Sequence, residues 1–415
     1  TSPLLCLSLL IGACGSTTAH TVGSSEPSAP TGGASVDSGD AAPQGTGTDG
    51  FVHPGLLVTR GMLDFVKAKI AAGAEPWTGA LAKAAASKLG NLAYVPHPIA
   101  DVDCGSYSNP DIGCTDEKND ADAAYTHALL WYHTGNPSHA DKAIEIMNAW
   151  ASTVEQHTNS NAPLQSAWVA EVFPRAGEII RATYPGWTAA ETGKFAAMLA
   201  KVYLPQVIAG SKSNGNWELS MIEAVMNIGV FTDDPATFQT GVSMWRKRTP
   251  AYLYLTGDGP TPVPPPTGTI TGSKLSAYWY DQTQLVDGVC QETCRDLGHV
   301  QYGLAAMVNA AETARIQGVD LFSEEETRLQ AGLEFHAGLL NGGVVPAWLC
   351  GGTLAAVTPA PMWEIAYNAF ANGLGQPMPE TKRLVQTIRP TASDHHMVWE
   401  TLTHAEVGTA GLPGL

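Results

Sequence analysis

Four side chains that can carry charge or move a proton recur at helical spacing near the middle of the chain. They are an acid, a guanidinium, an imidazole and a phenol in the segment DGVCQETCRDLGHVQYGLAAMVNAAETARIQG: Glu292, Arg295, His299 and Tyr302. Steps of three, four and three residues place all four on one face of a helix. An imidazole or a phenol can transfer a proton, and a guanidinium can hold a carboxylate. This face could therefore be the wall of a catalytic site.

The remainder of that segment is typical of a buried helix. Small and apolar residues follow Tyr302, as in a closely packed inner helix, and buried charges need partners or a ligand. The alternative is a purely structural ion pair between Glu292 and Arg295, which are three residues apart. We favour a site over that alternative.

A second polar segment, SNGNWE at residues 213–218, lies where one predicted helix ends and the next begins. Asn and Gly are ordinary residues for helix caps, so this segment indicates a site only together with the first. Aromatic side chains could stack on sugars or, equally well, pack in the core; these are Trp168, Trp217, Tyr280, Trp363 and Trp399. A further wall could come from Asp394, His395, His396, Trp399 and Glu400.

No metal and no cofactor are predicted. Cys290 and Cys294 are four residues apart, but no second pair of ligands at suitable spacing completes a zinc set. The pair His395 and His396 lacks the HExxH arrangement. The chain also contains no serine nucleophile elbow, P-loop or dinucleotide fingerprint, which sets aside esterases, phosphotransferases and Rossmann oxidoreductases.

Helices must position these groups, because strand-like alternation is scarce and apolar residues recur with helical period along the chain. The segments predicted to be helical are 62–72, 77–89, 121–132, 139–154, 169–182, 189–208, 217–230, 235–248, 292–317, 324–340, 362–371 and 380–388. Short breaks between helices favour antiparallel helical hairpins. The sequence shows no repeat of fixed period, which disfavours an open solenoid. We predict an all-α fold, an incomplete α/α barrel or toroid, and expect the irregular stretch Thr256–Val289 to be functional or mobile.

The composition restricts the partners. The chain has 415 residues, 44% of them hydrophobic, and a formal net charge of -17. That acidity argues against nucleic acid as a partner. It would also repel an acidic polymer at long range, so the few cations would have to be concentrated in the site.

The N-terminal residues predict export. Residues 1–14 resemble a lipoprotein-type signal segment in which Cys14 would carry the lipid. The alternative is an ordinary export signal in which a cysteine occurs at this position by chance. Residues 15–50 are rich in Ser, Thr, Gly, Ala and Pro and read as a disordered linker, which leaves 51–415 as the folded domain. We expect a lipoprotein of the outer membrane, cell surface or periplasm, or otherwise a secreted protein. We also expect a monomer that contacts the membrane only through its lipid.

The remaining cysteines suit an exported protein. Cys104 and Cys114 bracket a short loop and are predicted to form a disulfide. One of Cys290 and Cys294 is predicted to pair with Cys350, and the sequence leaves open which one.

The combination of an NGNWE turn and a later ETxRDxxHxxYG helix, residues 292–303, resembles the alginate-lyase superfamily, including the related glucuronan-cleaving lyases. The similarity extends more loosely from ADAAYTHALLWYHTGNPSHADKAIEIMNAW to WETLTHAE and so covers most of the chain after Phe51. It implies a polysaccharide lyase that cleaves a uronic-acid polymer by β-elimination, with an acidic polysaccharide as its partner.

The resemblance also implies roles for individual residues. The catalytic set is Asn216, Arg295, His299 and Tyr302, in which Asn216 and Arg295 neutralise the uronate carboxylate and Tyr302 or His299 is the base. The nearby Arg295 guanidinium favours the phenolate and is expected to lower the pKa of Tyr302. The substrate-binding set is Asn214, Trp217, Tyr280, Gln291, Glu292 and His396. The chain departs from well-known members in having Trp217 after Asn216 and Gln301 before Tyr302, where those members have histidine; His299 could replace the missing imidazole.

Two other functions compete with the lyase. A glycoside hydrolase on the same toroid would need two carboxylates, for which Glu218 and Glu292 are the candidates. A lipid-anchored glycan-binding protein would use the aromatic residues and would not turn over its ligand.

Overall fold

The computed structural model describes residues 50–106, 108–268, 270–282 and 284–410. The predicted signal segment 1–14 with Cys14, and nearly all of the predicted linker 15–50, lie outside the described residues. Export, lipidation and the linker therefore stay predictions.

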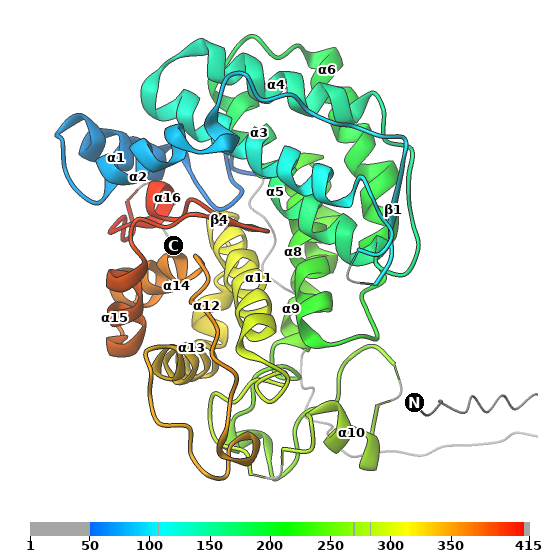
Figure 1. Ribbon diagram of the computed structural model, residues 1–415, viewed down its shortest axis with the longest axis vertical. Helices are drawn as coiled ribbons and strands as arrows, with labels where there is room; N and C mark the ends of the chain where they lie inside the picture. The colour runs from blue at the N-terminus through cyan, green and yellow to red at the C-terminus, as the bar shows by residue number, and fades with distance from the viewer. Residues whose placement is uncertain (1–49, 107, 269, 283, 411–415) are drawn as a thin grey trace, which may run out of the picture. The chain divides into compact units, whose positions relative to one another are not determined.

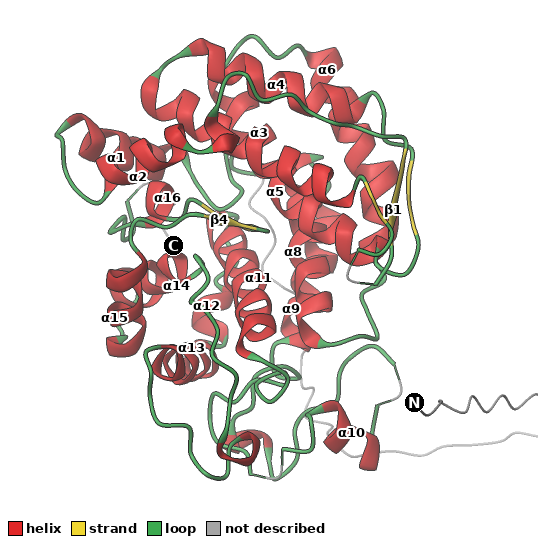
Figure 2. Cartoon of the chain, viewed as in Figure 1, coloured by secondary structure: helices red, strands yellow, loops and turns green. Residues whose placement is uncertain are grey.

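Helices make up most of the described chain (Figure 2), which confirms the predicted all-α class. The α-helices are α1 (Arg60–Ala71), α2 (Trp77–Ala86), α3 (Cys114–Thr134), α4 (Pro137–Ala151), α5 (Ala162–Thr183), α6 (Ala189–Met198), α7 (Leu204–Val207), α8 (Gly215–Phe231), α9 (Pro235–Arg248), α10 (Ser273–Tyr278), α11 (Leu297–Ile316), α12 (Leu321–Glu324), α13 (Glu326–Leu340), α14 (Trp363–Tyr367), α15 (Pro379–Ile388) and α16 (Thr401–His404). The short strands are β1 (Asp101–Cys104), β2 (Asp111–Ile112), β3 (Gln156–Thr158), β4 (Ser393–Asp394) and β5 (Met397–Val398).

An inner row of helices carries the core. Helix α5 packs between α3 and α8, and α8 packs in turn against α11, while α4 covers α3 and α9 covers α8 (Figure 1). The inner helices are buried on nearly all sides, so the acids in their sequences must find partners inside. Glu223 of α8, for example, pairs with Arg175 of α5 and accepts a hydrogen bond from Asn309 of α11.

The helix that was predicted to begin near Glu292 begins only at Leu297. Asp296 is the cause, because its side chain accepts a hydrogen bond from the backbone N–H of His299 and so caps the first turn. Glu292 and Arg295 thus lie in the turn before α11, and only His299 and Tyr302 are on the helix. The prediction that all four residues share one helical face was wrong.

Other predicted elements also differ in detail. The segment expected to be one helix over 189–208 contains a π-helical turn at Leu199–Tyr203, and the irregular stretch Thr256–Val289 contains the short helix α10. Both disulfide predictions are confirmed: Cys104 bonds to Cys114, and Cys294 bonds to Cys350, which leaves Cys290 as a buried thiol.

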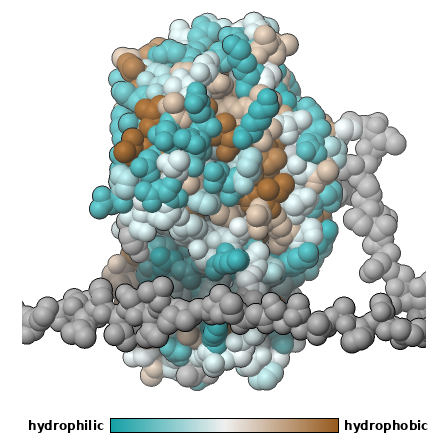
Figure 3. Space-filling model, turned by 90° about the vertical axis from the view of Figure 1, so that its right-hand side faces the viewer, coloured by the Kyte–Doolittle hydropathy of each residue, from teal (hydrophilic) through white to brown (hydrophobic). Residues whose placement is uncertain are grey.

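The surface of the described residues is mixed. Hydrophilic residues dominate the face drawn in Figure 3, and hydrophobic ones occur in small groups among them. None of the helices in the described ranges combines the length and apolarity that a membrane span requires.

Candidate active site

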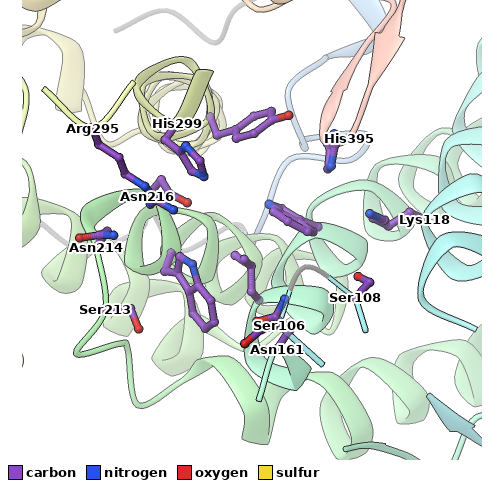
Figure 4. A pocket seen from close by; sticks show the side chains of 14 residues that line it. Ser106, Ser108, Lys118, Asn161, Ser213, Asn214, Asn216, Arg295, His299 and His395 are labelled. Atoms are coloured by element: carbon purple, nitrogen blue, oxygen red, sulfur yellow. The ribbon is translucent and has the colours of Figure 1, made fainter. Parts of the chain in front are cut away.

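A pocket of about 570 Å³ opens where six parts of the fold meet. Its walls come from the loop between β1 and β2, from α3 and α5, from the start of α8, from the start of α11 and from the β4–β5 hairpin (Figure 4). The lining residues are Ser106, Ser108, Lys118, Asn161, Leu164, Trp168, Ser213, Asn214, Asn216, Trp217, Arg295, His299, Tyr302 and His395. Two cations but no carboxylate are among these described residues, so the pocket departs in charge from the acidic chain around it.

A buried acid holds one end of this pocket together. Glu292 is fully buried, and its carboxylate accepts hydrogen bonds from Asn216 Nδ2 at 2.7 and 2.8 Å and from the backbone N–H of Asn216 at 3.0 Å. It also pairs with Arg295 at 2.7 Å. We assigned Glu292 to substrate binding, but it lies behind the pocket wall and positions Asn216 and Arg295.

Asn216 keeps a hydrogen-bond donor that Glu292 does not use. The two oxygens of one carboxylate lie close together, and their nearly equal distances from Nδ2 fit one amide hydrogen directed between them. The second hydrogen of Nδ2 remains, on a side chain that lines the pocket.

The backbones at the starts of α8 and α11 both pack closely against the side chain of Tyr252. A Cβ on Gly215 or on Gly303 would lie only 2.0 or 2.4 Å from atoms of the Tyr252 side chain, so both positions need glycine. The Tyr252 hydroxyl is 3.3 Å from Glu292. Gln291, also assigned to substrate binding, is buried and accepts a hydrogen bond from Gly215 N–H at 3.0 Å; it supports the turn instead.

His299 is held by the same residue that caps its helix. Its Nδ1 lies 2.6 Å from Asp296 Oδ2, and a carboxylate can only accept, so Nδ1 carries a proton; in the neutral ring Nε2 is then the acceptor. Burial raises the pKa of Asp296, but the hydrogen bonds from His299 outweigh it and the net pKa is lowered. The carboxylate therefore stays charged and fixes the ring.

The Tyr302 ring lies beside the rings of three histidines, and the pKa of Tyr302 is shifted in the direction opposite to our prediction. Burial, together with the charges of Asp394 and Asp296, raises the pKa of Tyr302 to about 12. We expected Arg295 to lower it, but Glu292 offsets the Arg295 charge. The phenol is therefore neutral at ordinary pH.

The C-terminal hairpin contributes His395 rather than His396. The His395 ring is 5.0 Å from the Tyr302 ring, and its Nδ1 is 2.6 Å from Asp394. His396, assigned to substrate binding, is fully buried; its Nε2 bonds to the carbonyl of Tyr302 at 3.3 Å, and burial lowers its pKa to about 3. His396 thus joins the hairpin to α11 as a neutral ring.

The remaining predicted residues divide between pocket and core. Asn214, Trp217 and Trp168 line the pocket, whereas Tyr280 lies outside the lining beside Asn214 and Arg295. Trp363 and Trp399 are buried in the core. Lys118, Asn161, Ser106 and Ser108 were not predicted, because nothing in their local sequence distinguishes them from ordinary surface residues.

The carboxylates required for hydrolysis do not face this pocket. Glu218 is buried beside Arg248 at 3.3 Å and accepts a hydrogen bond from Thr267, and Glu292 is committed to Asn216 and Arg295. Neither lines the pocket, so the geometry disfavours the glycoside hydrolase.

Comparison with known proteins shows which family and which solved structures this chain resembles. Residues 108–262 match the family model described as alginate lyase. Among solved structures, alginate lyase A1-III from Sphingomonas species A1 is 15% identical with a TM-score of 0.60, and the match covers 86% of this chain and 97% of that one. An alginate lyase from Bacteroides ovatus is 13% identical with a TM-score of 0.57, covering 85% and 100%. A search of curated proteins gave no match.

A variant of A1-III with phenylalanine in place of a tyrosine, complexed with a tetrasaccharide, is 16% identical with a TM-score of 0.61 over 86% of this chain and 97% of that one. At such identities the structures show the fold, and they confirm the predicted α/α toroid. Together with the family match they confirm the predicted resemblance to the alginate lyases and support the predicted enzyme class, a polysaccharide lyase.

Proposed function

We propose that this protein, a polysaccharide lyase by its match to the alginate-lyase family, cleaves a uronic-acid polymer by β-elimination and that alginate is its substrate class. The observation that supports this most strongly is the convergence of Arg295, Asn216, His299 and Tyr302 in a pocket whose described lining contains no carboxylate. An acidic polymer would meet cations and hydrogen-bond donors there.

The first requirement of the reaction is neutralisation of the substrate carboxylate. The proton at C5 of a uronate becomes acidic only when donors hold the charge that develops on the carboxylate in the enolate-like intermediate. Arg295 supplies a guanidinium at the pocket wall, and Asn216 supplies the amide hydrogen that Glu292 leaves unused.

The position of His299 supports it as the base. C5 bears both the carboxylate and the proton to be removed, so the base must lie beside the groups that hold the carboxylate. Figure 4 shows His299 near Asn216 and Arg295, whereas His395 lies toward the other end of the pocket. The Nδ1–Asp296 bond leaves Nε2 of His299 to take the proton.

Tyr302 is suited to be the acid that protonates the leaving oxygen at C4. Its raised pKa keeps the proton on the phenol until the glycosidic bond breaks. Base and acid come from successive turns of α11, so both approach one face of the sugar. In mannuronate and glucuronate, the C5 proton and the C4 oxygen lie on the same side of the ring.

This arrangement predicts a preference among polymers. Polymannuronate should be cleaved roughly tenfold or more faster than polyguluronate, in which the two groups lie on opposite sides. The rise in ultraviolet absorbance of the new double bond measures both rates at equal uronate concentration. Equal rates on the two polymers would contradict the one-sided arrangement, and glucuronan in a third reaction reports whether the C2 hydroxyl is discriminated.

The pKa of Tyr302 also predicts a pH profile. If Tyr302 is the acid, kcat/KM should stay within about twofold between roughly pH 8 and 10, above the range in which imidazoles ordinarily titrate and below about 12. If the phenolate were the base, kcat/KM would instead rise about tenfold per pH unit across that interval. Initial rates on polymannuronate, corrected for spontaneous alkaline elimination, decide between the two.

A further inference from the structure

The pocket has a second cation at the end opposite to Arg295. Lys118 extends from α3, and Figure 4 shows it beside Ser108 and His395, while Arg295 and Asn216 lie at the other end. Neither the mechanism nor the predicted binding set uses Lys118. The pocket therefore carries a positive charge at each of its two ends.

The acids around Lys118 are engaged elsewhere. Four carboxylates are near enough to act on its charge, and each is bonded to another group. Asp111 accepts from Thr115, Asp122 from Ser393, Asp394 from His395, and Glu117 from His157, Gln165 and Tyr203.

The Lys118 ammonium is left facing the pocket. Within the described ranges its Nζ makes no hydrogen bond or ion pair, and it lies over the Trp168 ring, 5.0 Å from the centroid. Burial is the largest influence on Lys118 and lowers its pKa despite the neighbouring acids. Partial burial of an ammonium without a hydrogen-bond acceptor costs free energy, and an anionic ligand that accepts its hydrogen bonds would lower that cost.

We propose that Lys118 binds the carboxylate of a second uronate residue, adjacent in the polymer to the one held by Arg295, with Trp168 as the ring on which this second sugar stacks. Asn161 and Ser108, which line the same end, supply hydrogen-bonding groups for its hydroxyls. The inference rests on the proposed function, since it assumes a polyuronate in this pocket. It makes the spacing of two carboxylates, and not a single charge, the feature that the pocket recognises.

The test is a set of lysine variants assayed on polymannuronate. Lys118→Met removes the charge but keeps an apolar stem beside Trp168, and it should raise KM about tenfold with kcat within about twofold. Lys118→Arg should recover most of the affinity. Lys382→Met, at an exposed lysine of α15, is the matched control and should leave both constants unchanged. The dependence of KM on salt should also weaken in Lys118→Met.

A KM for Lys118→Met within twofold of the wild-type value, or a loss confined to kcat, would overturn the proposal. Calorimetric binding of polymannuronate to the wild type and to Lys118→Met separates the two hypotheses. If the wild type forms no unsaturated product but binding depends on Lys118, the lyase fails and the carboxylate site stands. If product forms and Lys118→Met binds as the wild type does, the lyase stands and this site fails.

Discussion

Tyr302→Phe should lower kcat on polymannuronate by about a thousandfold while leaving the affinity for the polymer within a few-fold. Loss of a positioned proton donor typically costs a factor of 10² to 10⁴, and the elimination cannot finish unless the leaving oxygen at C4 is protonated. The ring itself stays, and it continues to pack beside Trp168 and His395. Steady-state rates of double-bond formation and calorimetric binding measure the two quantities separately.

The fold should tolerate this substitution. The phenolic oxygen of Tyr302 makes no hydrogen bond with any other described side chain, so its removal leaves no partner unsatisfied. The melting temperature should therefore match that of the wild type. A Tyr302→Phe protein that retains more than about a tenth of wild-type kcat would show that another group protonates the leaving oxygen, and His395 would be the next candidate.

The second large effect is expected at Arg295. Arg295→Ala should lower kcat/KM by a factor of about 10² to 10³, because it removes a charge that stabilises the developing enolate. Asn216→Ala should cost a similar factor. The double variant should lose less than the product of the two single losses, since both side chains are held by the one Glu292 carboxylate.

A surface pair provides the matched control. Arg246 of α9 forms an ion pair with Glu324, and both side chains are about 40% exposed, so Arg246→Ala should change kcat/KM by less than about twofold. Fully multiplicative losses in the Asn216 and Arg295 double variant would mean that the two side chains act independently of Glu292. An Arg295→Ala enzyme with wild-type kcat/KM would remove Arg295 from the mechanism.

Part of the fold can be predicted from the sequence because it depends on interactions between residues that are close along the chain. Apolar periodicity locates most helices, because burying one face of a helix is what stabilises it. The polar spacing of Arg295, His299 and Tyr302 indicates a site, and all three line the pocket. Their convergence has a different origin from the predicted one: Asp296 ends the turn and starts the helix, so Arg295 reaches the pocket from the turn.

Long-range contacts could not be read in this way. Glu292 binds Asn216 across 76 residues, and no local pattern distinguishes an acid that touches substrate from one that holds its neighbours. Lys118 enters the pocket only because α3 packs beside α5. The pKa of Tyr302 depends on its burial and on Asp394 of a distant hairpin, and so its direction could not be inferred from the nearby arginine alone.

The central claim is that the bond breaks by elimination, and the ratio of two products tests it most directly. Purified protein is incubated with polymannuronate, and the conjugated double bonds seen by ultraviolet absorbance are counted against new reducing ends. Elimination predicts that the wild type forms one double bond for each new reducing end and that Tyr302→Phe forms almost none of either product. Reducing ends without double bonds would show hydrolysis and contradict the account, and bound polymer without either product would show a glycan-binding protein.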